Sequence, residues 1–73
     1  MLERLKEIFK DVLKVDVDEN STPDNTDGWD SLAHIGLIVS IESEFDVKFT
    51  MSEIAQMTSF NKIYELLGEK ANG

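Results

Sequence analysis

The serine in Asp30-Ser31-Leu32 is the residue of this chain best placed for chemistry. It stands at the start of an apolar helical pattern, directly behind a loop rich in carboxylates. A hydroxyl at a helix N-terminus faces free backbone N–H groups and the positive end of the helix dipole, and both favour an anion at that point. We therefore expect Ser31 to carry a phosphate-linked group, although a plain helix cap is the commoner role of a serine in such a position.

A hydrolytic site is a second interpretation of the same segment. His34 follows Ser31 by three residues, which places both on one helix face. Asp27 or Asp30 would complete a set of serine, histidine and aspartate. The sequence has no G-x-S-x-G elbow and no recognisable pair of oxyanion donors, and the chain is too short to enclose a water-free site. We therefore expect a protein that is not an enzyme.

A calcium site is the main alternative function, because the acidic segment 16–27 fits the ligand register of an EF-hand loop. The residues in that register are Asp16, Asp18, Asn20, Thr22, Asp24 and Asp27. Ser21 stands where an EF-hand needs a glycine for its sharp turn, and Pro23 removes a backbone N–H that paired loops use. A second such loop is absent from the sequence. The alternative is thus a small EF-hand-like calcium-binding module, and we expect no specific metal site.

Negative charge is concentrated in one part of the chain. The net charge is −8, and residues 16–30 contain six acids and no base. Such a surface does not suit nucleic acid or an anionic membrane, since both are bound mainly through Lys and Arg. It steers the approach of basic proteins instead. The sequence predicts basic protein partners, with neither nucleic acid nor a membrane among them.

The length and composition limit the class of protein further. Its 73 residues suffice for a single domain over residues 1–73, with a thin core. The absence of cysteine excludes a disulfide framework and a thiolate zinc site. The first residues mix charges at once, and no apolar run reaches the length of a membrane span. We expect a soluble, cytoplasmic monomer.

Hydrophobic periodicity predicts an all-α fold. Apolar residues at helical spacing indicate a first helix over residues 2–14. Residues 15–30 break that period and form a long loop, whose ends we expect to be packed on the core by Val15, Val17 and Trp29. A second helix runs from Ser31, as its N-cap, to Phe45.

The rest of the chain predicts a short third helix and a final fourth one. Residues 46–49 alternate and indicate an extended link. The sequence from Thr50 to Glu53 is a capping box that opens a single helical turn. Ser59 caps the last helix, which we expect Gly68 to end or to fray, leaving a flexible tail from about residue 69. The predicted fold is a four-helix bundle with a long loop between helices 1 and 2 and a very short third helix.

The second helix has more apolar positions than one core-facing stripe requires. We expect its core face to comprise Leu37, Ile38, Ile41 and Phe45. A second, exposed face would then comprise Leu32, Ile35 and Val39. In a chain of this size an exposed apolar strip on a helix indicates a protein contact.

Two sequence blocks resemble the acyl carrier protein family. The first is Gly28-Trp29-Asp30-Ser31-Leu32, which matches the Asp-Ser-Leu motif at the start of that family's second helix. The second is Glu42-Ser43-Glu44-Phe45-Asp46-Val47-Lys48-Phe49, which matches the end of the same helix. The resemblance implies that a phosphopantetheinyl transferase attaches 4′-phosphopantetheine from coenzyme A to Ser31. The thiol of that arm would hold an acyl or aminoacyl group as a thioester, in fatty-acid, polyketide or modified-lipid biosynthesis.

The resemblance also implies partners and a place for the cargo. The partners would be acyl ligases, synthases or transferases with basic docking surfaces. The docking residues expected on this chain are Asp30, Leu32, Ile35, Val39 and Glu42. The interior expected to shelter the acyl chain is lined by Leu37, Ile38, Ile41, Phe45, Ile54 and Ile63. Ala33, Gly36 and Ser43 stand where fatty-acid carriers usually have acids, so we expect a specialised carrier with dedicated enzymes.

Overall fold

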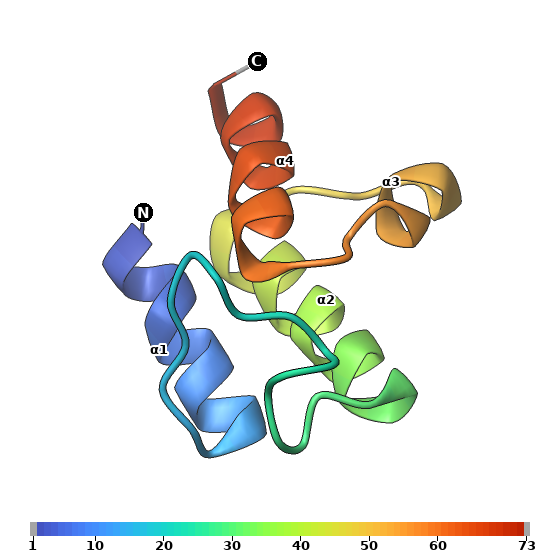
Figure 1. The fold of residues 1–73 in the computed structure, drawn as a ribbon. Coiled ribbons are helices and arrows are strands. Elements are labelled where there is room, and N and C mark those ends of the chain that lie inside the picture. The colour runs from blue at the N-terminus through green and yellow to red at the C-terminus, as the bar shows by residue number, and fades with distance from the viewer. Residues whose placement is uncertain (1, 73) are drawn as a thin grey trace.

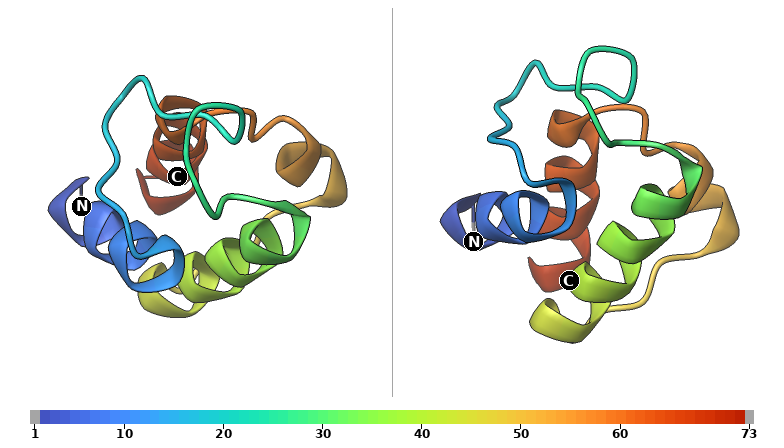
Figure 2. Two further views of the ribbon diagram at one scale, coloured as in Figure 1. Left: turned by 60° about the horizontal axis from the view of Figure 1, so that its bottom comes forward. Right: turned by 90° about the horizontal axis from the view of Figure 1, so that it is seen from below.

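The computed structural model of this protein describes residues 2–72. Within that range it has four helices: α1 (Leu2–Leu13), α2 (Ser31–Phe45), α3 (Met51–Ala55) and α4 (Phe60–Asn72). α1 and α2 pack against each other, and α3 lies at the edge of the molecule, far from α1 (Figures 1 and 2). The predicted all-α fold, with its long first loop and very short third helix, is confirmed.

The core is formed by one face of each of the three longer helices. Its helical members are Leu5, Ile8, Phe9, Leu13, Leu37, Ile38, Ile41, Phe60, Ile63, Leu66 and Leu67. Phe9 is at its centre and meets Phe60 edge-on, with ring centroids 5.0 Å apart. Edge-to-face aromatic pairs add specific geometry to the area that they bury. α3 has no buried residue, although its Ile54 packs against the core and Met57, just after it, is buried there.

The long loop between α1 and α2 is attached to the core at three points. Val17 near its start and Trp29 at its end are buried, and Val15 packs against the core, as the sequence predicts. Between them, the backbone N–H of Phe60 donates a hydrogen bond to the carbonyl of Ser21 over 2.9 Å. This bond joins the middle of the loop to the first residue of α4, and the loop can be followed across that helix end in Figure 2. The loop is therefore a fixed part of the fold.

The ends of the shorter elements agree with their capping residues, with one exception. The predicted capping box is present, since Thr50 Oγ1 accepts from the N–H of Glu53 and the Glu53 carboxylate accepts from the N–H of Thr50. Ser59 Oγ accepts from the N–H of Lys62, as expected of a cap for α4. The exception is Gly68, because α4 continues through it to Asn72.

The prediction that Gly68 ends the last helix is therefore wrong, and the segment expected to be loose from residue 69 is helical up to Asn72. Gly73 lies outside the described residues. Leu66 and Leu67 are buried directly before the glycine, and Lys70 after it pairs with Glu53 of α3. Tertiary contacts on both sides of the glycine override its poor helix propensity.

Two glycines give a matched test of the backbone. A Cβ on Gly36, inside α2, would meet only Val12 at 3.8 Å, an ordinary contact. Gly36→Ala should stabilise the fold by up to ~1 kcal/mol, or about 4–8 °C in Tm, because alanine favours the helix. Gly28 has φ +84°, which strains any L side chain, so Gly28→Ala should destabilise by about 1–2 kcal/mol. Thermal unfolding followed by circular dichroism checks both variants. Equal changes in Tm would contradict the different backbone conformations of Gly28 and Gly36.

Candidate functional site

The start of α2 is capped by Asp30, and Ser31 is the first helical residue. Asp30 has extended backbone angles, and its Oδ1 accepts a hydrogen bond from the N–H of Ala33 over 2.8 Å. The prediction that Ser31 is the N-cap is therefore wrong by one position. A carboxylate one residue earlier reaches the N–H of the first turn and carries the charge that the helix dipole favours.

The hydroxyl of Ser31 is left free by this arrangement. Ser31 is exposed, and its Oγ makes no hydrogen bond with any of the residues that the structure describes. Because Asp30 satisfies the helix end, the Ser31 side chain has no structural task there. It is a reachable hydroxyl on a rigid helix start, which is what an external modifying enzyme requires.

A groove of about 630 Å³ lies beside this hydroxyl. It is lined by Pro23, Asp24, Trp29, Asp30, Ser31, His34, Ile35, Ile54, Ala55 and Met57. The long loop and the start of α2 form one side, and α3 with the residues after it forms the other. Most of the lining is apolar, so the groove can take the apolar part of a group attached to Ser31.

Trp29 and His34 form a hydrogen-bonded pair in this groove. The indole Nε1 donates to His34 Nδ1 over 3.1 Å, and the two rings are nearly parallel, with 21° between their planes. Sequence spacing does not pair these two residues, because Trp29 lies before the helix and the two share no helical period. The one feature of the sequence that could have pointed to this hydrogen bond is the tryptophan directly before the Asp-Ser-Leu motif.

This pair also decides the hydrolytic interpretation. The Nδ1 atom of His34 accepts from Trp29, and the carboxylate of Asp30 accepts from the backbone of Ala33. No hydrogen bond joins Ser31 to His34 within the described part of the chain, although the two residues are three apart on α2. His34 and Asp30 have separate partners, and Ser31 has none among the described residues, so the three side chains do not form a catalytic relay.

The predicted exposed strip on α2 is present. The exposed fractions of Leu32, Ile35 and Val39 are 82%, 55% and 59%. Leu37 and Ile41, on the other side of α2, are completely buried. The remaining predicted docking acid, Glu42, is half-buried, and its Oε2 accepts from the N–H of Phe49 over 2.9 Å. Glu42 therefore holds the extended link after α2 in place.

The residues predicted to line an acyl cavity are mostly packed core. Leu37, Ile41 and Ile63 are completely buried, and Ile38 nearly so, while Phe45 and Ile54 are half-buried. Of these six residues, only Ile54 lines the groove beside Ser31. Sequence patterns identify apolar positions, but they do not show where side chains leave a space between them.

Several side chains of the acidic segment 16–27 accept hydrogen bonds within the loop, and Asp16 pairs with Lys10 of α1 over 3.5 Å. Asp18 Oδ1 accepts from the backbone N–H of Asn20, and the Oδ1 atom of Asn25 accepts from the N–H of Thr22. In the described range 2–72, no three His, Cys, Asp or Glu side chains gather where they could hold one metal ion. The hydrogen bonds stabilise turns of the loop, and the geometry gives the EF-hand-like alternative no support.

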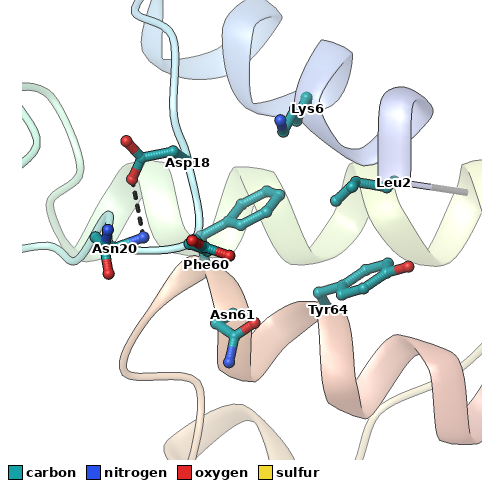
Figure 3. Close-up of a pocket in the computed structure, with 8 residues that line it drawn as sticks. Leu2, Lys6, Asp18, Asn20, Phe60, Asn61 and Tyr64 are labelled. Carbon is teal, nitrogen blue, oxygen red and sulfur yellow. Dashed lines mark hydrogen bonds between the residues drawn. The ribbon is translucent and has the colours of Figure 1, made fainter.

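A second groove, of about 370 Å³, lies between the start of α1, the loop and the start of α4 (Figure 3). Leu2, Phe60 and Tyr64 form its apolar side, and Lys6 and Asp18 lie at its rim. It shares no lining residue with the groove beside Ser31. Of the candidate site residues, only Asp18 and Asn20 of the EF-hand register line it, and none of the residues expected to carry or shelter the acyl group does so.

The α3 wall of the Ser31 groove is attached to α4 by one ion pair. The Lys70 ammonium lies 2.8 Å from Glu53 Oε1, with exposed side-chain fractions of 30% and 21%. The hydrogen bond from Lys70, together with that from the N–H of Thr50, lowers the pKa of Glu53 below its ordinary value of 4.5. A carboxylate with a lowered pKa stabilises the fold above its unfolded-state pKa, and this stability is lost as the pH falls through the folded-state value.

Lys70→Met should therefore weaken the dependence of stability on pH. Between about pH 6 and pH 3 the wild type should lose more thermal stability than the variant. In the variant the pKa of Glu53 is lowered less, because the hydrogen bond from Lys70 is absent. Lys62→Met is the matched control, because the Lys62–Glu65 pair is longer, at 3.9 Å, and more exposed. Thermal melts over this pH range measure the effect, and parallel curves for Lys70→Met and the wild type would contradict it.

Comparisons with known proteins agree with this geometry. A family model described as "Phosphopantetheine attachment site" matches residues 3–67. The acyl carrier protein of Petrotoga mobilis is 37% identical over 76 residues, which cover 99% of this chain and 88% of that protein. Polyketide-8 synthase acyl carrier protein 2 of Streptomyces avermitilis is 36% identical over 73 residues, which cover 93% of this chain and 82% of the relative.

Two solved structures have the same fold. A holo acyl carrier protein from Geobacter metallireducens, solved by solution NMR, has a TM-score of 0.88 and 28% identity, covering 97% of this chain and 85% of that chain. A chain in the structure of the ishigamide ketosynthase/chain length factor has a TM-score of 0.81 and 29% identity, covering 99% of this chain and 94% of the other.

The chain belongs to the acyl carrier family that is defined by a phosphopantetheine attachment site. It is a non-catalytic carrier that bears phosphopantetheine and holds acyl groups in fatty-acid or polyketide biosynthesis. The resemblance seen in the sequence is thereby confirmed. Across residues 2–72, no helix is both long enough and apolar enough to cross a membrane.

Proposed function

We propose that the Oγ atom of Ser31 is the attachment point of 4′-phosphopantetheine. The observation that carries this proposal is the free, exposed hydroxyl at the first residue of α2, beside a groove of about 630 Å³. When bound, the group supplies the terminal thiol that the cysteine-free chain lacks. The Ser31 hydroxyl attacks the diphosphate phosphorus of coenzyme A that bears the pantetheine. The bond from this phosphorus to the bridging oxygen breaks, 3′,5′-ADP leaves, and the serine proton passes to a base on the transferase.

The residues around Ser31 divide the remaining tasks. Asp30 keeps the helix start ordered, so the hydroxyl is presented in one position. Trp29, Ile54 and Met57 offer an apolar surface to the attached arm and to its cargo. A long acyl chain entering between Leu37, Ile41 and Ile63 would have to separate side chains that are completely buried. We therefore place the cargo in the groove first, where Ile54 contacts it, and the other five predicted interior residues contact only a chain long enough to separate them.

The docking surface that we propose is the strip Leu32, Ile35 and Val39, next to Asp30 and the acidic loop. Exposed apolar side chains offer a contact surface, and the six acids over residues 16–30, of which only Asp16 has a basic partner among the described residues, steer a basic protein toward it. The first such partner is the phosphopantetheinyl transferase. Acyl ligases, synthases or transferases follow, and the structural likeness to a chain solved with a ketosynthase/chain length factor supports an enzyme of that kind.

The helix that bears this strip favours dedicated partners over those of general fatty-acid synthesis. The first turn of α2 contains no acidic residue. Ala33 and Gly36, further along, are uncharged as well. With less charge on the helix itself, recognition depends more on the apolar strip and on the loop, and a partner must match both.

Intact mass spectrometry tests the attachment. The protein is incubated with coenzyme A, Mg²⁺ and a broad-specificity phosphopantetheinyl transferase, and the product is fragmented to locate the modification. We expect the mass of one phosphopantetheine on the peptide that contains Ser31. A modification on another residue, or no gain in mass while a known carrier is loaded in the same reaction, would overturn the proposal.

A further inference from the structure

The hydrogen bond from Trp29 determines which nitrogen of His34 carries a proton. An indole Nε1–H can only donate, so Nδ1 of His34 must accept, and the proton of the neutral imidazole is then on Nε2. No hydrogen bond to Nε2 occurs among the described residues, and no buried side-chain nitrogen or oxygen among them lacks a partner. Nε2 is therefore open to solvent, and it is an unused N–H donor in the wall of the groove.

The His34 ring is held by a chain of aromatic contacts. Trp29 is only 4% exposed and meets Phe9 edge-on, with ring centroids 5.2 Å apart. Phe9 in turn contacts Phe60 at the centre of the core. A donor on such a support loses little conformational freedom when it binds a ligand, so its hydrogen bond is more favourable than that of a mobile surface side chain.

The charges around the groove show what this donor would bind. Asp24 and Asp30 line the groove, whereas no Lys or Arg does so in the described part of the chain. Asp30 also occupies the N–H of Ala33, which removes one backbone donor from the helix start. A phosphodiester on Ser31 would thus face two carboxylates. His34, three residues along the same helix face, is the side chain in the groove with a free N–H to offer it.

We propose that the Nε2–H of His34 donates a hydrogen bond to a phosphate oxygen of the phosphopantetheine arm, with Trp29 as the residue that positions the ring. This inference rests on the attachment at Ser31 proposed above. The bond holds the phosphate at the mouth of the groove, against the repulsion of Asp24 and Asp30. The rest of the arm then starts along the apolar wall near Ile54 and Met57, where the cargo can leave water.

NMR of the loaded protein tests this contact directly. His34 is the only histidine in the sequence, so its ring signals need no assignment against others. In 15N-histidine-labelled protein at neutral pH, the apo form should show the proton on Nε2, and loading should shift the Nε2 and Hε2 signals. Identical ring signals in the apo and holo forms would overturn the proposal, even if no variant can be prepared.

Three variants identify the atoms involved, with the 31P signal of the holo protein as the readout. His34→Phe keeps a ring but has no donor, so the 31P chemical shift should move away from the wild-type value. His34→Gln can accept from Trp29 and still donate, so it should restore most of that shift. Trp29→Phe removes the positioning bond, and the His34 ring should then show both neutral forms. A 31P signal that is unchanged in His34→Phe would overturn the contact.

The mass spectrum of each sample separates the two proposals. If loading occurs on Ser31 and the His34 signals do not respond, the contact is wrong and the attachment site stands. If no phosphopantetheine is found on Ser31, both proposals fail together.

Discussion

Ser31→Ala is expected to fold as stably as the wild type and to accept no phosphopantetheine. The hydroxyl is the proposed nucleophile, so its removal should abolish loading completely. It makes no hydrogen bond within the described residues, and Asp30 provides the cap, so the free energy of unfolding should change little. Loading is measured by intact mass and stability by chemical unfolding.

Asp30 offers the complementary pair of variants. Asp30→Ala removes the side chain that accepts from Ala33 and should destabilise the fold by ~1 kcal/mol. Asp30→Asn keeps a good cap and should retain most of the stability. If Ser31→Ala lost that stability instead, the serine would be the cap and the hydroxyl would not be free. If Ser31→Ala still gained phosphopantetheine, the attachment site would be wrong.

Ile35→Asp is expected to reduce the rate of acyl transfer from a cognate partner by about 30-fold or more. An aspartate in the centre of an apolar contact removes a hot spot, and such residues contribute about 2 kcal/mol or more. The exposed fraction of Ile35 is 55%, so the fold should tolerate the change. Transfer is measured at limiting partner concentration, and helix content is checked by circular dichroism.

Met51→Asp is the matched control for this variant. Met51, at the start of α3, is 82% exposed and lies outside the strip on α2. The Met51→Asp variant adds the same charge to another exposed apolar position, and its rate of acyl transfer should be close to that of the wild type. An equal loss in both variants would mean that added negative charge, and not the strip, is responsible. A loss of helix content in Ile35→Asp would show that Ile35 supports the core.

The helices and the strip could be predicted because each depends on residues close together in sequence. The start of α2, its core face and the capping box at Thr50 follow from local patterns of three or four residues. The error at Ser31 was a choice between two adjacent capping residues, and only backbone geometry decides it. The error at Gly68 arose because the last turn of α4 is held by the ion pair of Lys70 with Glu53. Glu53 lies on another helix, fifteen residues before the glycine.

The candidate site was predictable to a different extent. Ser31 was predicted as the attachment residue from the Asp-Ser-Leu motif. The family match confirms that the chain has a phosphopantetheine attachment site, without naming the residue. The groove beside it was not predictable, since it depends on where α3 lies relative to Trp29 and His34. Leu37, Ile41 and Ile63, which were expected to line an acyl cavity, are completely buried in this structure, and the sequence did not show how closely they pack. The spacing of residues along one helix shows which face their side chains occupy. It does not show how closely the neighbouring helices pack against that face.

The position of Trp29 gives this carrier an optical probe of its own. It is the only tryptophan in the sequence, and its ring lies in the wall of the groove with its N–H bonded to His34. The emission of an indole depends on the polarity around the ring and on the hydrogen bond at its nitrogen. With the arm attached at Ser31 as proposed, loading, acylation and release of the cargo should each change that surrounding. The fluorescence of the unlabelled protein should then report each of these steps in real time and beside the partner enzymes.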